Sequence, residues 1–262
     1  MLPGLAYPVY TCVCPQTKWT FDVRCLTVSE EDKLLQSATF GYQMLHNLNE
    51  VIYRCITAKP DTVKTFEDFR KKVTQKDRDA LLYSLVQASD ADKQVIETTC
   101  FSCRAQETVT VKLSDCFSAT LYEGEEGKIL EERPTVTSTV GEWDIVFTLR
   151  APTLEHERQV MTYLGTKPTV NILTLLLITE KIEFKKAGED TVKEEATNLS
   201  DIEVAVRSLP SKVIKKVRKA YQTTLGKYGI DLKYKFICSS CGATNEHTID
   251  LVEALFRTVA GE

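Results

Sequence analysis

Hydrophobic and polar residues alternate in some runs of this chain and follow a helical spacing in others. Residues 18–26 (KWTFDVRCL) alternate, which predicts a β-strand. Residues 44–55 place apolar side chains at i, i+3, i+7 and i+10, and this one-sided spacing predicts a helix. Residues 77–88 (DRDALLYSLVQA) predict another amphipathic helix. The pattern therefore mixes helices and strands along the chain.

Two strand–turn–strand patterns carry a Cys-x-x-Cys pair in the turn. The first runs from residue 94 to 113 around Cys100 and Cys103, and the second runs from residue 231 to 251 around Cys238 and Cys241. Strand-like runs on both sides of a short turn predict β-hairpins. We therefore expect two antiparallel hairpins with cysteines at their tips.

The order of predicted elements recurs along the chain. Residues 143–149 predict a strand, and Thr153 opens a helix with acidic residues in its first turn, as Thr27 does after the strand 18–26. The two hairpins also match in register, with leucine 13 residues after the first cysteine of each pair. The fold class predicted is α+β, a tandem pseudo-repeat of helices and Cys-tipped hairpins.

Three segments follow from this order. Residues 1–16 are rich in proline and glycine and predict an extended N-terminal arm without a core of its own. Residues 17–133 form a first half that ends after the first hairpin, and residues 134–262 form a second half with the other hairpin. We expect the two halves to pack as one domain.

Four cysteines in two Cys-x-x-Cys pairs supply the ligands of a closed tetrahedral zinc site. We predict one structural zinc per chain, held by Cys100, Cys103, Cys238 and Cys241, although 134 residues separate Cys103 from Cys238. Two alternatives stay open: a former metal site held by packing and thiols, and a redox pair. The redox alternative lacks the helix N-terminus that lowers the pKa of such thiols.

The other candidate functional residues form no pattern typical of a catalytic site, so we expect a protein that is not an enzyme. Only three histidines are present, and the sequence contains no Gly-rich phosphate loop, no G-x-S-x-G and no H-E-x-x-H. Cys12, Cys14 and Cys25 predict ordinary thiols, because a C-x-C spacing is awkward for chelation. His247 follows the second Cys pair by six residues and could support it, but we expect a solvated strand histidine. We expect Arg104 to make the first cysteine turn less ideal than the second, which has Gly242.

Net charge and the lack of targeting signals bear on whether the protein binds nucleic acid or membranes and on its compartment. A net charge of −4 argues against a nucleic-acid surface, and the basic run 212–219 predicts a solvated helix face. The most apolar window, residues 170–179, is too short to span a bilayer, and the N-terminus has no secretory pattern. An odd number of cysteines indicates a reducing compartment. A soluble cytoplasmic protein is expected.

Three stretches together resemble a known family. They are Leu2-Pro-Gly-x-x-Tyr7-Pro followed by Asp22-Val-Arg-x-Leu-Thr-Val-x-Glu-Glu31; Asp79-x-Leu-Leu-x-x-Leu-x-x-Ala-Ser89 before the first Cys pair; and Gly229-Ile-Asp, Cys238-x-x-Cys241-Gly, Asp250-Leu and Phe256-Arg. They cover about half of the chain and resemble the small baseplate proteins of T4-like contractile-tailed phages, of the baseplate hub or its assembly. The family's usual Cys-Pro-x-Cys-Gly form is absent at Cys100–Cys103.

The resemblance implies a non-enzymatic structural component of the virion that docks to other baseplate and tail proteins in a larger hetero-oligomer. It places the protein in the tail baseplate, and in the host cytoplasm during assembly. It implies no membrane and no nucleic acid as partners. Two alternatives remain at this point: a tail-assembly chaperone absent from the mature virion, and a cellular zinc-ribbon adaptor module. A thiol oxidoreductase is a third hypothesis.

Overall fold

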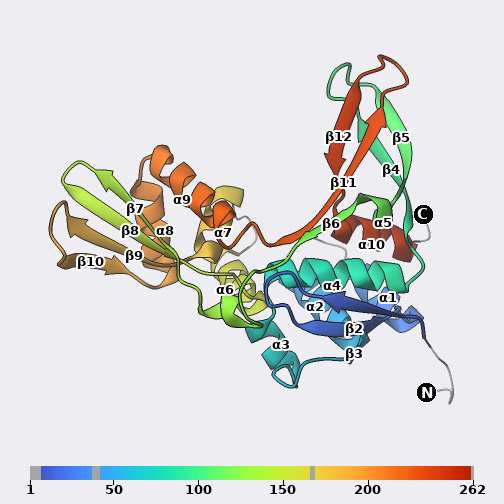
Figure 1. Cartoon of the computed structure of the whole chain (residues 1–262), viewed down its shortest axis with the longest axis horizontal. Helices are drawn as coiled ribbons and strands as arrows, with labels where there is room; N and C mark the ends of the chain where they lie inside the picture. Colours follow the sequence, from blue (N-terminus) through green and yellow to red (C-terminus); the bar gives the residue numbers. More distant parts are fainter. Residues whose placement is uncertain (1–6, 37–41, 166–168, 261–262) are drawn as a thin grey trace.

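The computed structural model of the chain describes residues 7–36, 42–165 and 169–260. It is elongated, with two lobes and a pair of hairpins that stand out from one lobe (Figure 1). Each lobe has its own hydrophobic core. The first core takes side chains from residues 12–113 and 232–255 together with Leu154, and the second core from residues 122–228.

This division differs from the predicted boundary at residues 133 and 134. The cause is strand pairing near the end of the chain: β11 (Gly229–Ile237) pairs with β6 (Phe117–Thr120), which precedes the second core in the sequence. The chain therefore leaves the first lobe once, builds the second lobe and returns. The tandem pseudo-repeat expected from the sequence stays a prediction. Both hairpins pack on the first core, so the two lobes do not each carry one hairpin.

A long buried helix organises the first lobe. Helix α4 (Gln75–Ala88) contacts β1, β2, β11, α2 and α10, so ten of its residues are buried. Around it lie a three-stranded antiparallel sheet in the order β1-β2-β3 and five further helices. The elements are β1 (Val9–Val13), β2 (Thr20–Arg24), α1 (Val28–Leu35), α2 (Tyr42–Cys55), β3 (Ile56–Ala58), α3 (Phe66–Lys72), α5 (Leu113–Cys116) and α10 (Leu251–Ala260).

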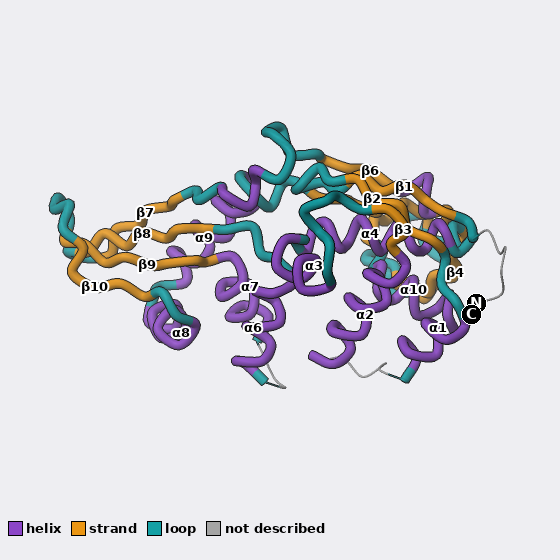
Figure 2. The backbone as a smooth tube through the Cα atoms, turned by 90° about the horizontal axis from the view of Figure 1, so that it is seen from below, coloured by secondary structure: helices purple, strands orange, loops and turns teal. Residues whose placement is uncertain are grey.

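The second lobe is a four-stranded antiparallel sheet covered by helices. Its strand order is β10-β9-β8-β7, and in Figure 2 most helices lie on one side of the molecule and most strands on the other. The apolar window 170–179 forms mainly a helix, because it packs against both α6 and α8. The elements are η1 (Lys128–Glu131), β7 (Thr135–Val140), β8 (Trp143–Leu149), α6 (Leu154–Leu164), α7 (Val170–Ile178), β9 (Thr179–Lys186), β10 (Val192–Ala196), α8 (Leu199–Ser208) and α9 (Ser211–Thr223).

The predicted N-terminal arm is part of the first lobe wherever the structure describes it. Strand β1 pairs antiparallel with β2, and Cys12 and Cys14 are buried in the first core. The carboxylate of Asp77 accepts the backbone N–H of Gln16 at 2.8 Å, at the start of α4. The two cysteines anchor this segment to the core, which its proline- and glycine-rich composition did not indicate. Residues 1–6 of the predicted arm lie outside the described residues.

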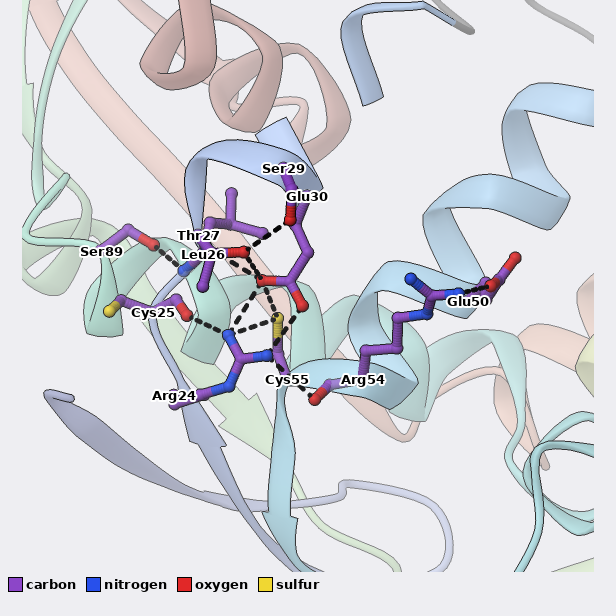
Figure 3. Close-up of polar contacts among 10 residues, drawn as sticks. All are labelled: Arg24, Cys25, Leu26, Thr27, Ser29, Glu30, Glu50, Arg54, Cys55 and Ser89. Atoms are coloured by element: carbon purple, nitrogen blue, oxygen red, sulfur yellow. Dashed lines mark hydrogen bonds and ion pairs between the residues drawn. The ribbon is translucent and has the colours of Figure 1, made fainter. Parts of the chain in front are cut away.

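A buried ion pair joins β2, α1 and α2. The guanidinium of Arg24 donates to both carboxylate oxygens of Glu30, at 2.9 and 2.7 Å, and to the carbonyls of Cys25 and Arg54 (Figure 3). Glu30 also accepts the N–H of Thr27 at 2.9 Å, which is the glutamate half of the predicted capping box. The predicted helix start at Thr27 is confirmed. The acidic residue Glu30 in its first turn binds Arg24 and so holds α1 against β2.

A second buried ion pair joins the two lobes. Arg78 of α4 donates to Glu157 of α6 at 2.5 Å, and the amide of Gln75 donates to the other carboxylate oxygen at 2.7 Å. An isolated bridge between Thr74 and Thr153 lies next to it. Both threonines cap a helix, so the starts of α4 and α6 are fixed against each other.

Candidate metal centre

Both Cys-x-x-Cys pairs lie in the turns of antiparallel hairpins, as predicted. Strand β4 (Lys93–Thr99) pairs with β5 (Gln106–Lys112), and β11 pairs with β12 (Thr244–Thr248). The two hairpins lie side by side and project together from the first lobe (Figure 1). Residues far apart in the sequence therefore meet at one tip, which we call the hairpin tip.

Four sulfur atoms gather at the hairpin tip. The Sγ atoms of Cys100 and Cys241 are 3.7 Å apart and those of Cys103 and Cys238 are 3.6 Å apart, so each short distance crosses from one hairpin to the other. All four sulfurs lie within 4.8 Å of one another. A disulfide requires about 2.05 Å, so these cysteines are free thiols. The cluster could hold a metal ion.

The backbone of the two turns is closely matched. In each turn the N–H of the first cysteine donates to the carbonyl five residues later, at 2.9 and 3.0 Å, and the residue four positions later donates back, at 3.0 and 2.9 Å. That residue is Arg104 in the first turn and Gly242 in the second, with φ of 65° and 74°. Arg104 therefore adopts the left-handed conformation of the glycine, and the turn it closes is formed in the same way.

Burial and hydrogen bonds set the thiols apart. Cys100 and Cys238 are buried, whereas Cys103 and Cys241 are exposed. The backbone N–H of Cys103 lowers the pKa of the Cys100 thiol against the opposing effect of burial, and the amide of Asn245 adds to the lowering. Burial raises the pKa of the Cys238 thiol, and its hydrogen bond to a carboxylate adds to this effect. The surroundings of the two buried cysteines thus shift their pKa values in opposite directions.

Three side chains near the cluster make contacts that were not expected from the sequence. Asn245 and Glu107 contact the cysteine turns, and the ring of His247 stacks on Phe101 with centroids 4.2 Å apart. His247 also contacts the hydroxyl of Thr98 through Nδ1 at 3.2 Å, so it is not the solvated histidine expected. A usable signal was present, because Glu107 and Asn245 both stand seven residues after the first cysteine of a pair.

The other cysteines noted in the sequence lie away from the cluster. Cys12 and Cys14 are buried in the first core beside α4, and Cys25 is half-buried next to the Arg24 ion pair. Cys55 lies beneath that same ion pair, where burial raises its pKa to about 12. Within residues 7–36, 42–165 and 169–260, the four tip cysteines are the one group of His, Cys, Asp or Glu side chains that lie close enough together to hold a metal ion.

Fold and site define an α+β protein whose two hairpins, one before and one after the second lobe in the sequence, meet at a cluster of four cysteines. Residues 7–257 match the model of the family described as T4 bacteriophage base plate protein, so the chain belongs to this family. The resemblance drawn from the sequence is confirmed. No curated protein and no solved structure matches the chain. Among the described residues, no helix combines the length and apolar character needed to cross a membrane.

Proposed function

We propose that this protein is a non-enzymatic structural component of a phage tail base plate, in the hub region, which docks to other baseplate and tail proteins. The carrying observation is the family match over residues 7–257. On this proposal the protein is made in the host cytoplasm and then becomes part of a larger hetero-oligomer in the virion. Its work is to hold its shape and present contact surfaces.

One structural zinc ion at the hairpin tip is part of this proposal, with Cys100, Cys103, Cys238 and Cys241 as its ligands. A tetrahedron of Zn–S bonds of about 2.3 Å separates neighbouring sulfurs by about 3.8 Å. The short sulfur–sulfur distances of 3.6 and 3.7 Å fit this value. A redox role fits less well, because both pairs lie in hairpin turns, away from any helix N-terminus that would activate a thiolate.

Metal analysis of the purified protein tests the zinc site. We expect about one zinc per chain, and comparable losses of metal and of stability in Cys100→Ser and Cys238→Ser, because a closed site contributes directly to folding. Cys116→Ser, at a half-buried cysteine outside the cluster, is the matched control and retains the metal. Loss of metal in only one of the two tip variants contradicts a shared site.

The free edge of β1 supports the docking part of the proposal. The carbonyl of Pro8 accepts the N–H of Cys25, and the N–H of Cys14 donates to the carbonyl of Trp19, on either side of β2. By alternation, the N–H and C=O groups of Val9, Thr11 and Val13 point away from β2. The segment VYTCV has no charge, proline or bulge, the usual protections of an edge strand. We infer that an extended strand of a neighbouring tail protein pairs with this edge.

Mass spectrometry of purified phage particles tests this docking. We expect the protein among the base plate components, and we expect Thr11→Pro to be lost from particles while it stays folded, since proline is tolerated at an outward edge position. Thr137→Pro is the control, on the outer edge strand of the second sheet, and it remains in particles. Absence of the wild-type protein from mature particles indicates an assembly chaperone instead.

A further inference from the structure

The two cysteine turns hold each other through one pair of side chains. The side-chain oxygen of Asn245 accepts the N–H of Phe101 at 2.8 Å, and the carboxylate of Glu107 accepts the N–H of Ser239 at 2.8 Å. In each case the acceptor lies seven residues after the first cysteine of its own hairpin, and the donor lies one residue after the first cysteine of the other. The hairpin tip thus has an approximate twofold symmetry in its contacts.

This symmetry is broken at the sulfur atoms. The Asn245 amide donates a hydrogen bond to the sulfur of Cys100, with 3.4 Å between nitrogen and sulfur. Glu107 has no hydrogen to give, so the sulfur of Cys238 donates to its carboxylate at 3.2 Å instead. One buried sulfur is therefore an acceptor, and its counterpart is a donor.

Metal binding makes this difference matter. A metal-bound cysteine sulfur carries negative charge and no hydrogen, so it can only accept hydrogen bonds. At Cys100 the Asn245 contact persists and stabilises that charge, as partners behind metal ligands commonly do. At Cys238 the hydrogen bond to Glu107 is lost, and a carboxylate is left facing an anionic sulfur.

We infer that Glu107 and Asn245 are the positioning residues of the metal centre, and that they act in opposite directions: Asn245 strengthens the hold on the cation and Glu107 weakens it. The inference rests on the proposed zinc site. It reverses the expectation that the first cysteine turn, with Arg104, is the poorer half. The Cys238 half binds less tightly because its neighbour has the wrong charge.

A reciprocal pair of substitutions tests the inference in the full-length protein. Glu107→Gln keeps an oxygen that accepts the Ser239 N–H and removes the negative charge that faces the Cys238 sulfur. Asn245→Asp keeps the oxygen that accepts the Phe101 N–H and removes the donor to Cys100. Zinc affinity is measured by competition with a chelator, and we expect about tenfold tighter binding for Glu107→Gln and about tenfold weaker binding for Asn245→Asp.

Two controls separate this effect from damage to the fold. Circular dichroism of the metal-free variants checks that each remains folded, and the thiolate absorption of the Co²⁺-loaded proteins checks that four sulfurs still bind. Equal or weaker zinc binding by Glu107→Gln, with its fold intact, overturns the inference while the zinc site stands. Absence of zinc binding by the wild-type protein overturns the proposed site and the inference with it.

Discussion

Arg104 occupies a backbone conformation that normally favours glycine. Its φ of 65° closes the first cysteine turn, and Gly242 does the same in the second turn at 74°. A residue with a Cβ pays about 1–2 kcal/mol for the left-handed region. The first turn therefore forms at a cost that the surrounding contacts of the hairpin tip offset.

Replacing Arg104 with glycine should relieve this cost. We expect Arg104→Gly to raise the free energy of unfolding by about 0.5 kcal/mol, because relief of backbone strain exceeds the extra entropy of glycine in the unfolded chain. Gly242→Ala is the matched reverse change and should lower it by about 1 kcal/mol. Urea denaturation measures both. Destabilisation by Arg104→Gly would mean that the arginine side chain makes a contact outweighing the strain.

Glu30 gives the first lobe a pH dependence. Burial alone raises its pKa, but hydrogen bonds from Arg24 and Thr27 outweigh burial and lower the pKa from 4.5 to about 2. A carboxyl group whose pKa is lower in the folded state contributes its full stability above about pH 4.5. That contribution is lost progressively as the pH falls from 4.5 towards 2.

The variant Glu30→Gln isolates this contribution. At pH 7 we expect it to be less stable than wild type by about 2 kcal/mol, because Arg24 loses its buried ionic partner. At pH 3 the difference should shrink, since wild-type Glu30 is then losing its own contribution. Urea unfolding at both pH values provides the measurement. A difference that does not change with pH would show that charge is not what stabilises the site.

At the scale of elements, α4 shows what periodicity can and cannot predict. The pattern of residues 77–88 predicts an amphipathic helix, and a helix is present at Gln75–Ala88. Its polar residues Asp77 and Arg78 are nevertheless buried, because α6 and the Cys14–Thr17 loop cover the side expected to face water. Charge on a helix predicts exposure only where no other element packs on that face.

Removing the partner of Arg78 should be costly. We expect Glu157→Ala to lower the free energy of unfolding by about 3 kcal/mol, because it leaves a buried guanidinium without its counter-charge. Glu67→Ala is the control, since the Glu67–Lys71 pair on α3 is exposed, and its effect on the free energy of unfolding should be small. Thermal or urea denaturation tests both. Similar costs would show that the buried pair does not tie the lobes together.

At the scale of the whole molecule, the cysteine cluster joins the two sequence segments that build the first lobe. From the sequence we expected the cysteine cluster to lie between two halves of the fold. Both hairpins pack on the first core instead, and the second core lies within the 134 residues that separate the two Cys pairs. A metal at the tip would therefore close a long loop of the chain. It would stabilise the first lobe directly and the second lobe only through the joint between them.

Hydrogen exchange can separate these two regions. We expect removal of zinc by a chelator to accelerate amide exchange in β4, β5, β11 and β12, which carry the hairpin tip. The sheet β7–β10 should exchange at its original rate, because its core shares few contacts with the tip. Arg78→Met provides a contrasting perturbation at the joint between the lobes. Acceleration spread evenly over both sheets would contradict a local effect.

The local features of this protein can be predicted from its amino-acid sequence. Strand alternation around each Cys pair gave both hairpins and all four cysteines of the cluster, the threonine starts gave α1 and α6, and three short motifs gave the family. These features depend on residues close together in the chain, whose spacing directly sets which side chains share a face.

Which segments pack together is seen first in the folded molecule. The return of β11 to β6, the burial of Arg78 against Glu157 and the crossing of Glu107 and Asn245 to the opposite cysteine turn all join residues far apart in the sequence. No periodicity records such contacts, because they depend on which apolar faces bury each other once the elements exist. For the same reason the sequence predicted one boundary near residue 133, whereas the second core lies between the two sequence segments that form the first core.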